Sequence, residues 1–122
     1  MFRVTKEFHF SASHQLGHLA PDHPCARLHG HNYIVEIELA AEDLDERGFV
    51  RDYRDLDALK TYIDTTFDHR HLNEVLGDRR VTAEQLARHF YEWCAARYPE
   101  TTAARVSETP KTWAEYRPTP RP

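Results

Sequence analysis

One cysteine and two histidines fall within seven residues in the segment CARLHGH, residues 25–31, directly before an alternating apolar stretch. Residues two apart on a strand point to the same face, so the side chains of His29 and His31 project together. His14 ends an earlier alternating stretch, in phase with its apolar face. Three imidazoles with one open position are typical of a catalytic zinc site, so the sequence predicts a metal site if these stretches pair. The alternative is a set of hydrogen-bonded histidines in a polar loop.

Cys25 could act in either of two ways beside such a metal. As a fourth ligand it would complete a tetrahedral, structural site. As a free thiol it could act as a base or nucleophile, because a nearby cation and imidazoles favour the thiolate. The spacing leaves both open. Cys94 lies on the apolar face of an expected helix, and we expect it to be inert.

Two further groups could move protons or bind a substrate. Asp68 precedes His69 in DHRHLN, and an aspartate can orient a histidine base if a turn brings the adjacent side chains together. The alternative is a polar helix end, where histidine suits the C-terminal dipole. Glu108, in VSETP, could accept two N–H donors of a heterocycle side by side, although such a carboxylate is more often solvated.

The strands that must position these residues follow from period-two alternation. It predicts strands over residues 2–14 and 31–40, with a loop between them that is broken by Gly17, Pro21 and Pro24. AARVSET and KTWAEYR predict two short strands that meet at Pro110. Outer strands of so small a sheet would be left open, and pairing with other subunits is one way to cover them.

Two helices are expected between the strand pairs. Leu56, Leu59, Ile63 and Phe67 recur with helical spacing, and Asp52 is a candidate N-cap for the helix that they form. Thr82 and Gln85 form a capping box for a second helix. Its expected buried residues are Leu86, Phe90, Trp93 and Cys94. The order β-β-α-α-β-β predicts an α+β fold with an antiparallel sheet.

Composition narrows the class of protein. A chain of 122 residues suits one domain, which we place at residues 1–117, followed by a loose proline-rich tail at 118–122. The net charge is −4 and lysines and arginines form no long run, so neither nucleic acid nor membrane is an expected partner. No signal peptide and no apolar run of about 20 residues is visible. Two distant cysteines favour reduced thiols and a cytoplasmic location.

Together, these segments resemble the 6-pyruvoyltetrahydropterin synthase family, and most of all its short bacterial branch, the 6-carboxy-5,6,7,8-tetrahydropterin synthases of the queuosine pathway. The short CxxxHGH spacing resembles that branch. The departure is Val81, where the family more often has proline before the threonine. The resembling pieces span nearly the whole chain in the family order: FSASH, CARLHGHNY, GFVRDYRDLDALK, FDHRHLNE, VTAEQLA and VSETPKTWAEY.

The resemblance implies a tunnelling fold (T-fold), a four-stranded antiparallel sheet with two helices on one face, assembled from trimers into a homohexamer with active sites between subunits. It implies a small-molecule substrate, 7,8-dihydroneopterin triphosphate, converted to 6-carboxytetrahydropterin, acetaldehyde and triphosphate. The alternatives are the pyruvoyl-forming synthase of tetrahydrobiopterin biosynthesis and, from another class, a non-catalytic zinc-stabilised binding module.

The resemblance also assigns roles to residues. It implies that zinc (Zn2+) is the cofactor, held by His14, His29 and His31. It implies proton transfer by Cys25, Asp68 and His69, and a pterin anchor at Glu108, which could serve the zinc of a neighbouring chain. The family does not require His71. For the triphosphate, Arg27, Lys111 and Arg105 are candidates without a geometric argument.

Overall fold

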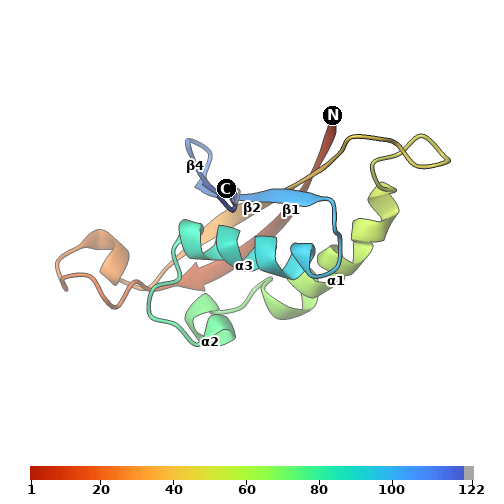
Figure 1. Cartoon of the computed structure of the whole chain (residues 1–122). Helices are drawn as coiled ribbons and strands as arrows, with labels where there is room; N and C mark the ends of the chain where they lie inside the picture. Colours follow the sequence, from red (N-terminus) through yellow and green to blue (C-terminus); the bar gives the residue numbers. More distant parts are fainter. Residues whose placement is uncertain (120–122) are drawn as a thin grey trace.

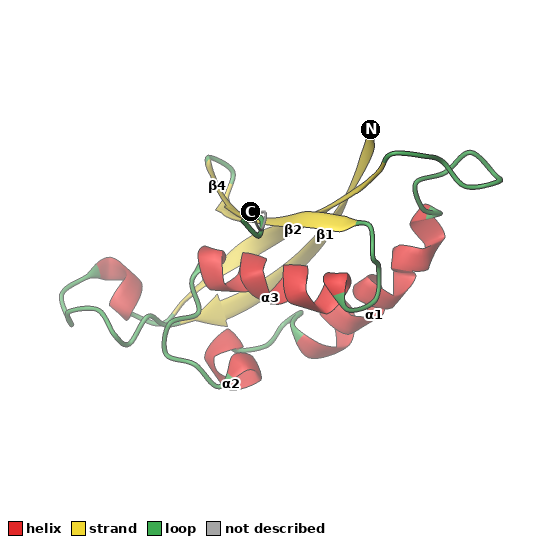
Figure 2. Ribbon diagram, viewed as in Figure 1, coloured by secondary structure: helices red, strands yellow, loops and turns green. Residues whose placement is uncertain are grey.

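The computed structural model of the chain describes residues 1–119 and contains one four-stranded antiparallel sheet in the order β1-β2-β3-β4. The strands are β1 (Phe2–His14), β2 (His29–Ala41), β3 (Thr101–Thr109) and β4 (Thr112–Tyr116). The helices α1 (Asp57–Thr66), α2 (Leu72–Leu76) and α3 (Ala83–Ala95) follow β2 in the chain. All three lie on one face of the sheet (Figure 1, Figure 2). The expected α+β order is confirmed.

The core lies between this face of the sheet and the helices. Alternation along β2 buries Tyr33, Val35, Ile37 and Leu39, as the sequence predicts. The expected helical stripe of α1 is buried as well, from Leu56 to Phe67. Burial of apolar area at about 25 cal/mol per Å² is the main term that holds the helices on the sheet.

One expected core residue of α3 lies only partly in the core. Leu86, Phe90 and Cys94 are fully buried, but Trp93 is half-buried. Its ring stacks on Tyr62 of α1, with ring centroids 4.8 Å apart and planes 8° from parallel. Trp93 therefore covers the edge of the core, where a large aromatic ring gains contact area without being enclosed.

The helix ends carry the expected caps. The side chain of Asp52 accepts a hydrogen bond from the Arg54 N–H at 2.9 Å, at the start of the single 3-10 turn η2 (Tyr53–Leu56) that leads into α1. The Thr82 hydroxyl accepts from the Gln85 N–H at 3.2 Å. The Thr82 N–H donates instead to the carbonyl of Arg80, so only half of the capping box is formed.

The short helix α2 is not among the sequence expectations. Five residues are too few to show a helical period, although Gly77 after it adopts φ +62°, the left-handed conformation that often ends helices. The loop between β1 and β2 extends beyond the end of the sheet and contains one 3-10 turn, η1 (Pro24–Ala26) (Figure 1). Of the expected tail, residues 120–122 lie outside the described residues.

Candidate active site

The three predicted histidines converge at the end of the sheet where β1 ends and β2 begins. The β1–β2 register pairs His14 with His29 and Ala12 with His31. One ring nitrogen from each histidine lies within 4.8 Å of the other two. The convergence expected from strand phase is confirmed, because both strands turn these side chains toward the helix-covered face.

Backbone carbonyls fix the orientation of two of the rings. The Nδ1 of His14 donates to the carbonyl of Val81 at 2.6 Å, and the Nδ1 of His29 donates to the carbonyl of Arg27 at 2.6 Å. Each Nε2 then carries a lone pair, as in histidines that ligate metals. These two Nε2 atoms are 2.8 Å apart. Two acceptor nitrogens at this separation repel each other unless a positive charge lies between them, so the site fits a metal ion.

Burial favours the uncharged form, which ligates metals, in two of these histidines. His14 is 1% exposed, and burial lowers its pKa to about 4, although the bond to Val81 opposes the shift. Burial also lowers the pKa of His31, while the carboxylate of Glu108 opposes that shift. Imidazoles that are neutral at pH 7 need lose no proton to bind a cation.

Glu108 lies beside the same cluster, in its own chain. Its Oε2 is 3.9 Å from the Nε2 of His14 and 3.7 Å from the Nε2 of His31. This oxygen and the hydroxyl of Tyr33 are buried and have no hydrogen-bond partner within residues 1–119. Buried polar groups are seldom left unpaired, so both atoms are available to a ligand.

Asp68 and His69 form the pair expected of an oriented base. The Nδ1 of His69 is 3.0 Å from the Oδ2 of Asp68. His69 has φ +59°, and this left-handed residue makes the turn that brings adjacent side chains together. Ser11 of β1 holds the turn, since its N–H donates to the Asp68 Oδ1 at 2.9 Å and its carbonyl accepts the His69 N–H at 2.6 Å. The Ser11 N–H first, and His69 second, lower the pKa of Asp68.

Cys25 lies in the 3-10 turn of the β1–β2 loop and is partly buried. Its carbonyl accepts the N–H of Leu16 at 2.9 Å, which ties the turn to the chain two residues beyond His14. The atoms that cluster within 4.8 Å are those of the three histidines alone among the residues described. This arrangement disfavours Cys25 as a fourth ligand, and its role as a free thiol stays a prediction.

Two surface hollows meet at His31. One, of roughly 500 Å³, is lined by His31, His69, Arg70 and His71 together with parts of β1 and β2. The other, of roughly 430 Å³, is lined by His31 and Glu108, among others. Arg70 and His71 are not among the site residues that the sequence predicts. Only their proximity to His69 in the sequence indicates that they belong to the site. The backbone contacts that bring this segment to β1 produce no periodic pattern of residue types.

An open antiparallel sheet with helices on one face, and with three convergent histidines that could hold a metal ion, defines a small α+β protein. No helix within the described residues is long and apolar enough to cross a membrane. The family model for 6-pyruvoyl tetrahydropterin synthase matches residues 3–119, and the chain belongs to that family. The fold is therefore the expected tunnelling fold.

Comparisons with individual proteins support this family assignment. The structure of 6-pyruvoyl tetrahydropterin synthase from Caenorhabditis elegans superposes with a TM-score of 0.84 at 25% identity, over 97% of this chain and 96% of that one. The 6-carboxy-5,6,7,8-tetrahydropterin synthase of Bacillus subtilis is 31% identical over 96% of this chain and 86% of its own length. The enzyme of that name from Synechocystis is 37% identical over 71% of this chain and 70% of its own length.

Proposed function

We propose that the protein is a zinc-dependent 6-carboxy-5,6,7,8-tetrahydropterin synthase that acts on 7,8-dihydroneopterin triphosphate in queuosine biosynthesis. The observation that carries the proposal is the convergence of His14, His29 and His31 beside the Asp68–His69 turn. The Bacillus subtilis and Synechocystis relatives, which carry this enzyme's name, support it.

The histidines would hold the metal through their free ring nitrogens. A bound zinc ion would supply Lewis acidity next to the substrate side chain, where C–H and O–H groups must lose protons. Glu108, with an unpaired buried oxygen, would accept N–H donors of the pterin ring. That contact fixes the side chain of the substrate over the histidines.

Side chains of the protein would carry out the proton transfers. Asp68 holds the Nδ1 of His69, which leaves the Nε2 free to accept or donate a proton. The thiolate of Cys25 would act on the opposite face of the substrate. Triphosphate leaves, and hydrolytic cleavage of the remaining side chain, in which water supplies the second carboxyl oxygen, releases acetaldehyde and leaves a 6-carboxyl group.

Two alternatives remain testable. The pyruvoyl-forming reaction would use the same groups, and the nematode structure bears that name. The short CxxxHGH spacing and the bacterial relatives favour the carboxy product. A non-catalytic zinc-stabilised module is the alternative from another class, and it should unfold when zinc is chelated. An enzyme held together by its core should lose activity while its fold survives.

The deciding experiment is product identification. The zinc-loaded protein is incubated with 7,8-dihydroneopterin triphosphate, and pterins and acetaldehyde are measured by mass spectrometry. Carboxytetrahydropterin with matching acetaldehyde supports the proposal. A pyruvoyl product assigns the chain to the biopterin reaction, and no turnover with zinc bound supports the binding module.

We also propose a cytoplasmic homohexamer built from two trimers. The outer edge of β4 and most of the outer edge of β1 pair with no other strand in residues 1–119, and open edges of this kind are usually covered. Native mass spectrometry should give six times the 14.3 kDa of one chain. A monomeric mass at micromolar concentration would contradict the hexamer.

A further inference from the structure

The side chain of Asn73, in the short helix α2, contacts the backbone directly after His14. Its Oδ1 accepts the N–H of Gln15 at 2.8 Å, and its Nδ2 donates to the carbonyl of the same residue at 2.7 Å. The Nδ2 also donates to the carbonyl of Asp78 at 3.1 Å, beyond the end of α2. These contacts engage the acceptor oxygen of the primary amide and both of its donor hydrogens.

The bonds to Gln15 continue a ladder along the outer edge of β1. The N–H of Ser13 donates to the carbonyl of Arg70 at 3.1 Å, and Ser13 forms an isolated parallel bridge with His71. The next step of a parallel ladder falls at Gln15, but the chain turns into α2 after His71, and helical carbonyls point along the helix axis. Because a primary amide has the donor and the acceptor of a peptide group, the side chain of Asn73 can supply this step.

Gln15 lies between two groups of the candidate site. On one side is His14, and on the other is Leu16, whose N–H donates to the carbonyl of Cys25 at 2.9 Å. Asn73 itself belongs to the segment that carries the Asp–His pair. One side chain therefore joins the strand end with a candidate metal ligand, the turn with the thiol and the segment with the base.

We propose that Asn73 is a positioning residue whose amide holds His14, the Cys25 turn and the segment with the Asp–His pair in a fixed relation within one chain. The inference rests on the proposed function, because it assumes that these groups act in the reaction. All the contacts lie within one chain, so the inference also holds in a hexamer with active sites between subunits. A displacement of about 1 Å far from the chemistry can cost a factor of about 10² in rate.

Two variants test the proposal through turnover of 7,8-dihydroneopterin triphosphate by the zinc-loaded protein. Asn73→Asp keeps the shape and the acceptor oxygen, but it loses both donors and places a negative charge against two carbonyls. Asn73→Ala loses every contact of the amide. We expect kcat to fall roughly tenfold in the first and up to roughly 10²-fold in the second. KM should change less than about threefold, because the amide is engaged by the backbone of its own chain.

Two further readouts do not depend on turnover. Cobalt(II), bound in place of zinc, should give a changed visible spectrum in both variants, because the position of His14 relative to the other ligands changes. Alkylation of Cys25 by iodoacetamide should become roughly threefold to tenfold faster, because its turn opens more often. Cys94 is fully buried and should not contribute to this rate.

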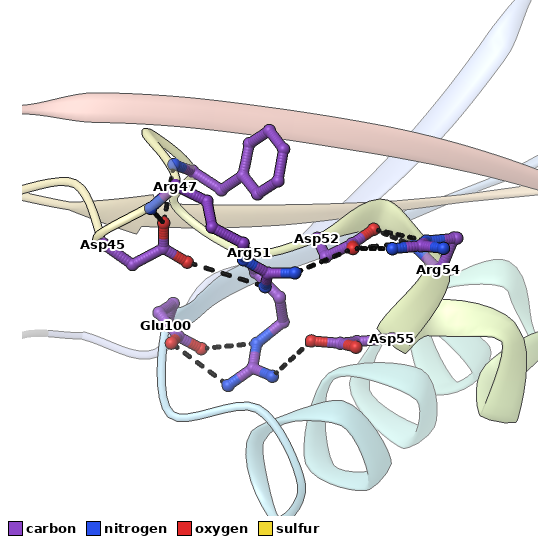
Figure 3. Close-up of polar contacts among 8 residues, drawn as sticks. Asp45, Arg47, Arg51, Asp52, Arg54, Asp55 and Glu100 are labelled. Carbon is purple, nitrogen blue, oxygen red and sulfur yellow. Dashed lines mark hydrogen bonds and ion pairs between the residues drawn. The ribbon is translucent and has the colours of Figure 1, made fainter.

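A clamp at the opposite end of the sheet provides the matched control. The guanidinium of Arg51 donates to the two carboxylate oxygens of Glu100 at 3.0 and 3.1 Å and ties the loop after β2 to the residue before β3 (Figure 3). Glu100→Gln should lower the stability in urea and leave the cobalt spectrum unchanged. It should keep kcat and the alkylation rate within about twofold of the unmodified protein, because distant sites are independent.

The outcomes separate positioning from a purely structural role. Asn73 variants that lose stability as the control does, but keep its kcat, cobalt spectrum and alkylation rate, would overturn the proposal. A change in KM alone would also overturn it, because the amide would then act on substrate binding. If the unmodified protein forms no pterin product, the proposed function fails, and the spectrum and the alkylation rate still decide whether Asn73 holds these groups.

Discussion

At the scale of single residues, the site depends on which ring nitrogen of each histidine carries the proton. Val81 and Arg27 hold the Nδ1 protons of His14 and His29, and Asp68 holds the Nδ1 of His69. In the proposed function, the Nε2 atoms of His14 and His29 would bind the metal and that of His69 would transfer a proton. Acceptors on one side of each ring therefore set the chemistry on the other.

Asp68→Asn tests the orientation of the base. The amide oxygen can still accept the Ser11 N–H, so the turn should persist, but the negative charge beside His69 is lost. We expect kcat to fall by roughly 10²–10⁴, the range of general acid–base catalysis, with little change in KM. The control is Asp64→Asn, which removes an exposed partner of Lys60 on α1. An unchanged kcat in Asp68→Asn would contradict the role given to the pair.

Cys25→Ala separates a catalytic thiol from a zinc ligand. If the histidines alone hold the metal, the variant should retain zinc by elemental analysis and lose product formation. The matched control is Cys94→Ala, because burial raises the pKa of Cys94 to about 12 and leaves that thiol unreactive. The control should be less stable but active. Loss of zinc from Cys25→Ala, or full activity in it, would disprove the assignment.

At the scale of elements, the start of α3 has two functions. The hydroxyl of Thr82 caps the helix, and the carbonyl of the preceding Val81 orients His14. Val81 is the position at which this chain departs from the family preference for proline. A backbone carbonyl is supplied by either residue, so the departure leaves the contact to His14 intact.

Thr82→Ala should therefore affect both stability and the metal. Loss of the cap is expected to cost about 1 kcal/mol in the free energy of unfolding, measured in urea. Because the cap fixes the residue before it, zinc should also bind more weakly, by up to roughly tenfold. Thr61→Ala, on the exposed face of α1, is the control and should change neither quantity appreciably. Lower stability with an unchanged zinc Kd would show that the helix start does not hold His14.

The elements that were predictable from sequence are those with a repeated period. Alternation in β1 and β2 predicted both strands and the phase of the three histidines, because β1 buries one face from Phe8 to His14 and β2 buries one face from Tyr33 to Leu39. The helix α2, with five residues, shows no period. Arg70 lines the active-site hollow because backbone groups of Ser11 form hydrogen bonds with the turn at His69. These hydrogen bonds join segments that are distant in the chain. Hydrogen bonds of this kind cannot be predicted from the pattern of residue types.

At the scale of the whole molecule, the two faces of the sheet are held by different forces. Apolar side chains join one face to the helices, while the uncovered face carries a network of charges centred on Glu38. Glu38 is 1% exposed because the side chains of Arg105 and Arg117, among others, lie over it. Through ion pairs, the network links β2 to β3 and to the residue that follows β4.

This network should make part of the stability depend on pH. Burial alone would raise the pKa of Glu38, but hydrogen bonds from Arg117, Thr102 and Arg105 outweigh it and lower the pKa to about 2. A pKa that is lower in the folded than in the unfolded state stabilises the fold above the unfolded value, and this contribution is lost as the pH falls toward 2.

Glu38→Gln should therefore destabilise the protein at pH 7 by roughly 2–3 kcal/mol, less than the ~3–5 kcal/mol of a fully broken buried pair, because Arg105 and Arg117 keep Glu115 as a partner. The difference from the unmodified protein should shrink as the pH is lowered from about 4.5 toward 2, when urea unfolding is followed at each pH. Glu46→Gln, at an exposed position in the loop after β2, is the control and should give parallel curves. A Glu38→Gln difference that stays constant over this range would show that the carboxylate's charge is not what holds this face together.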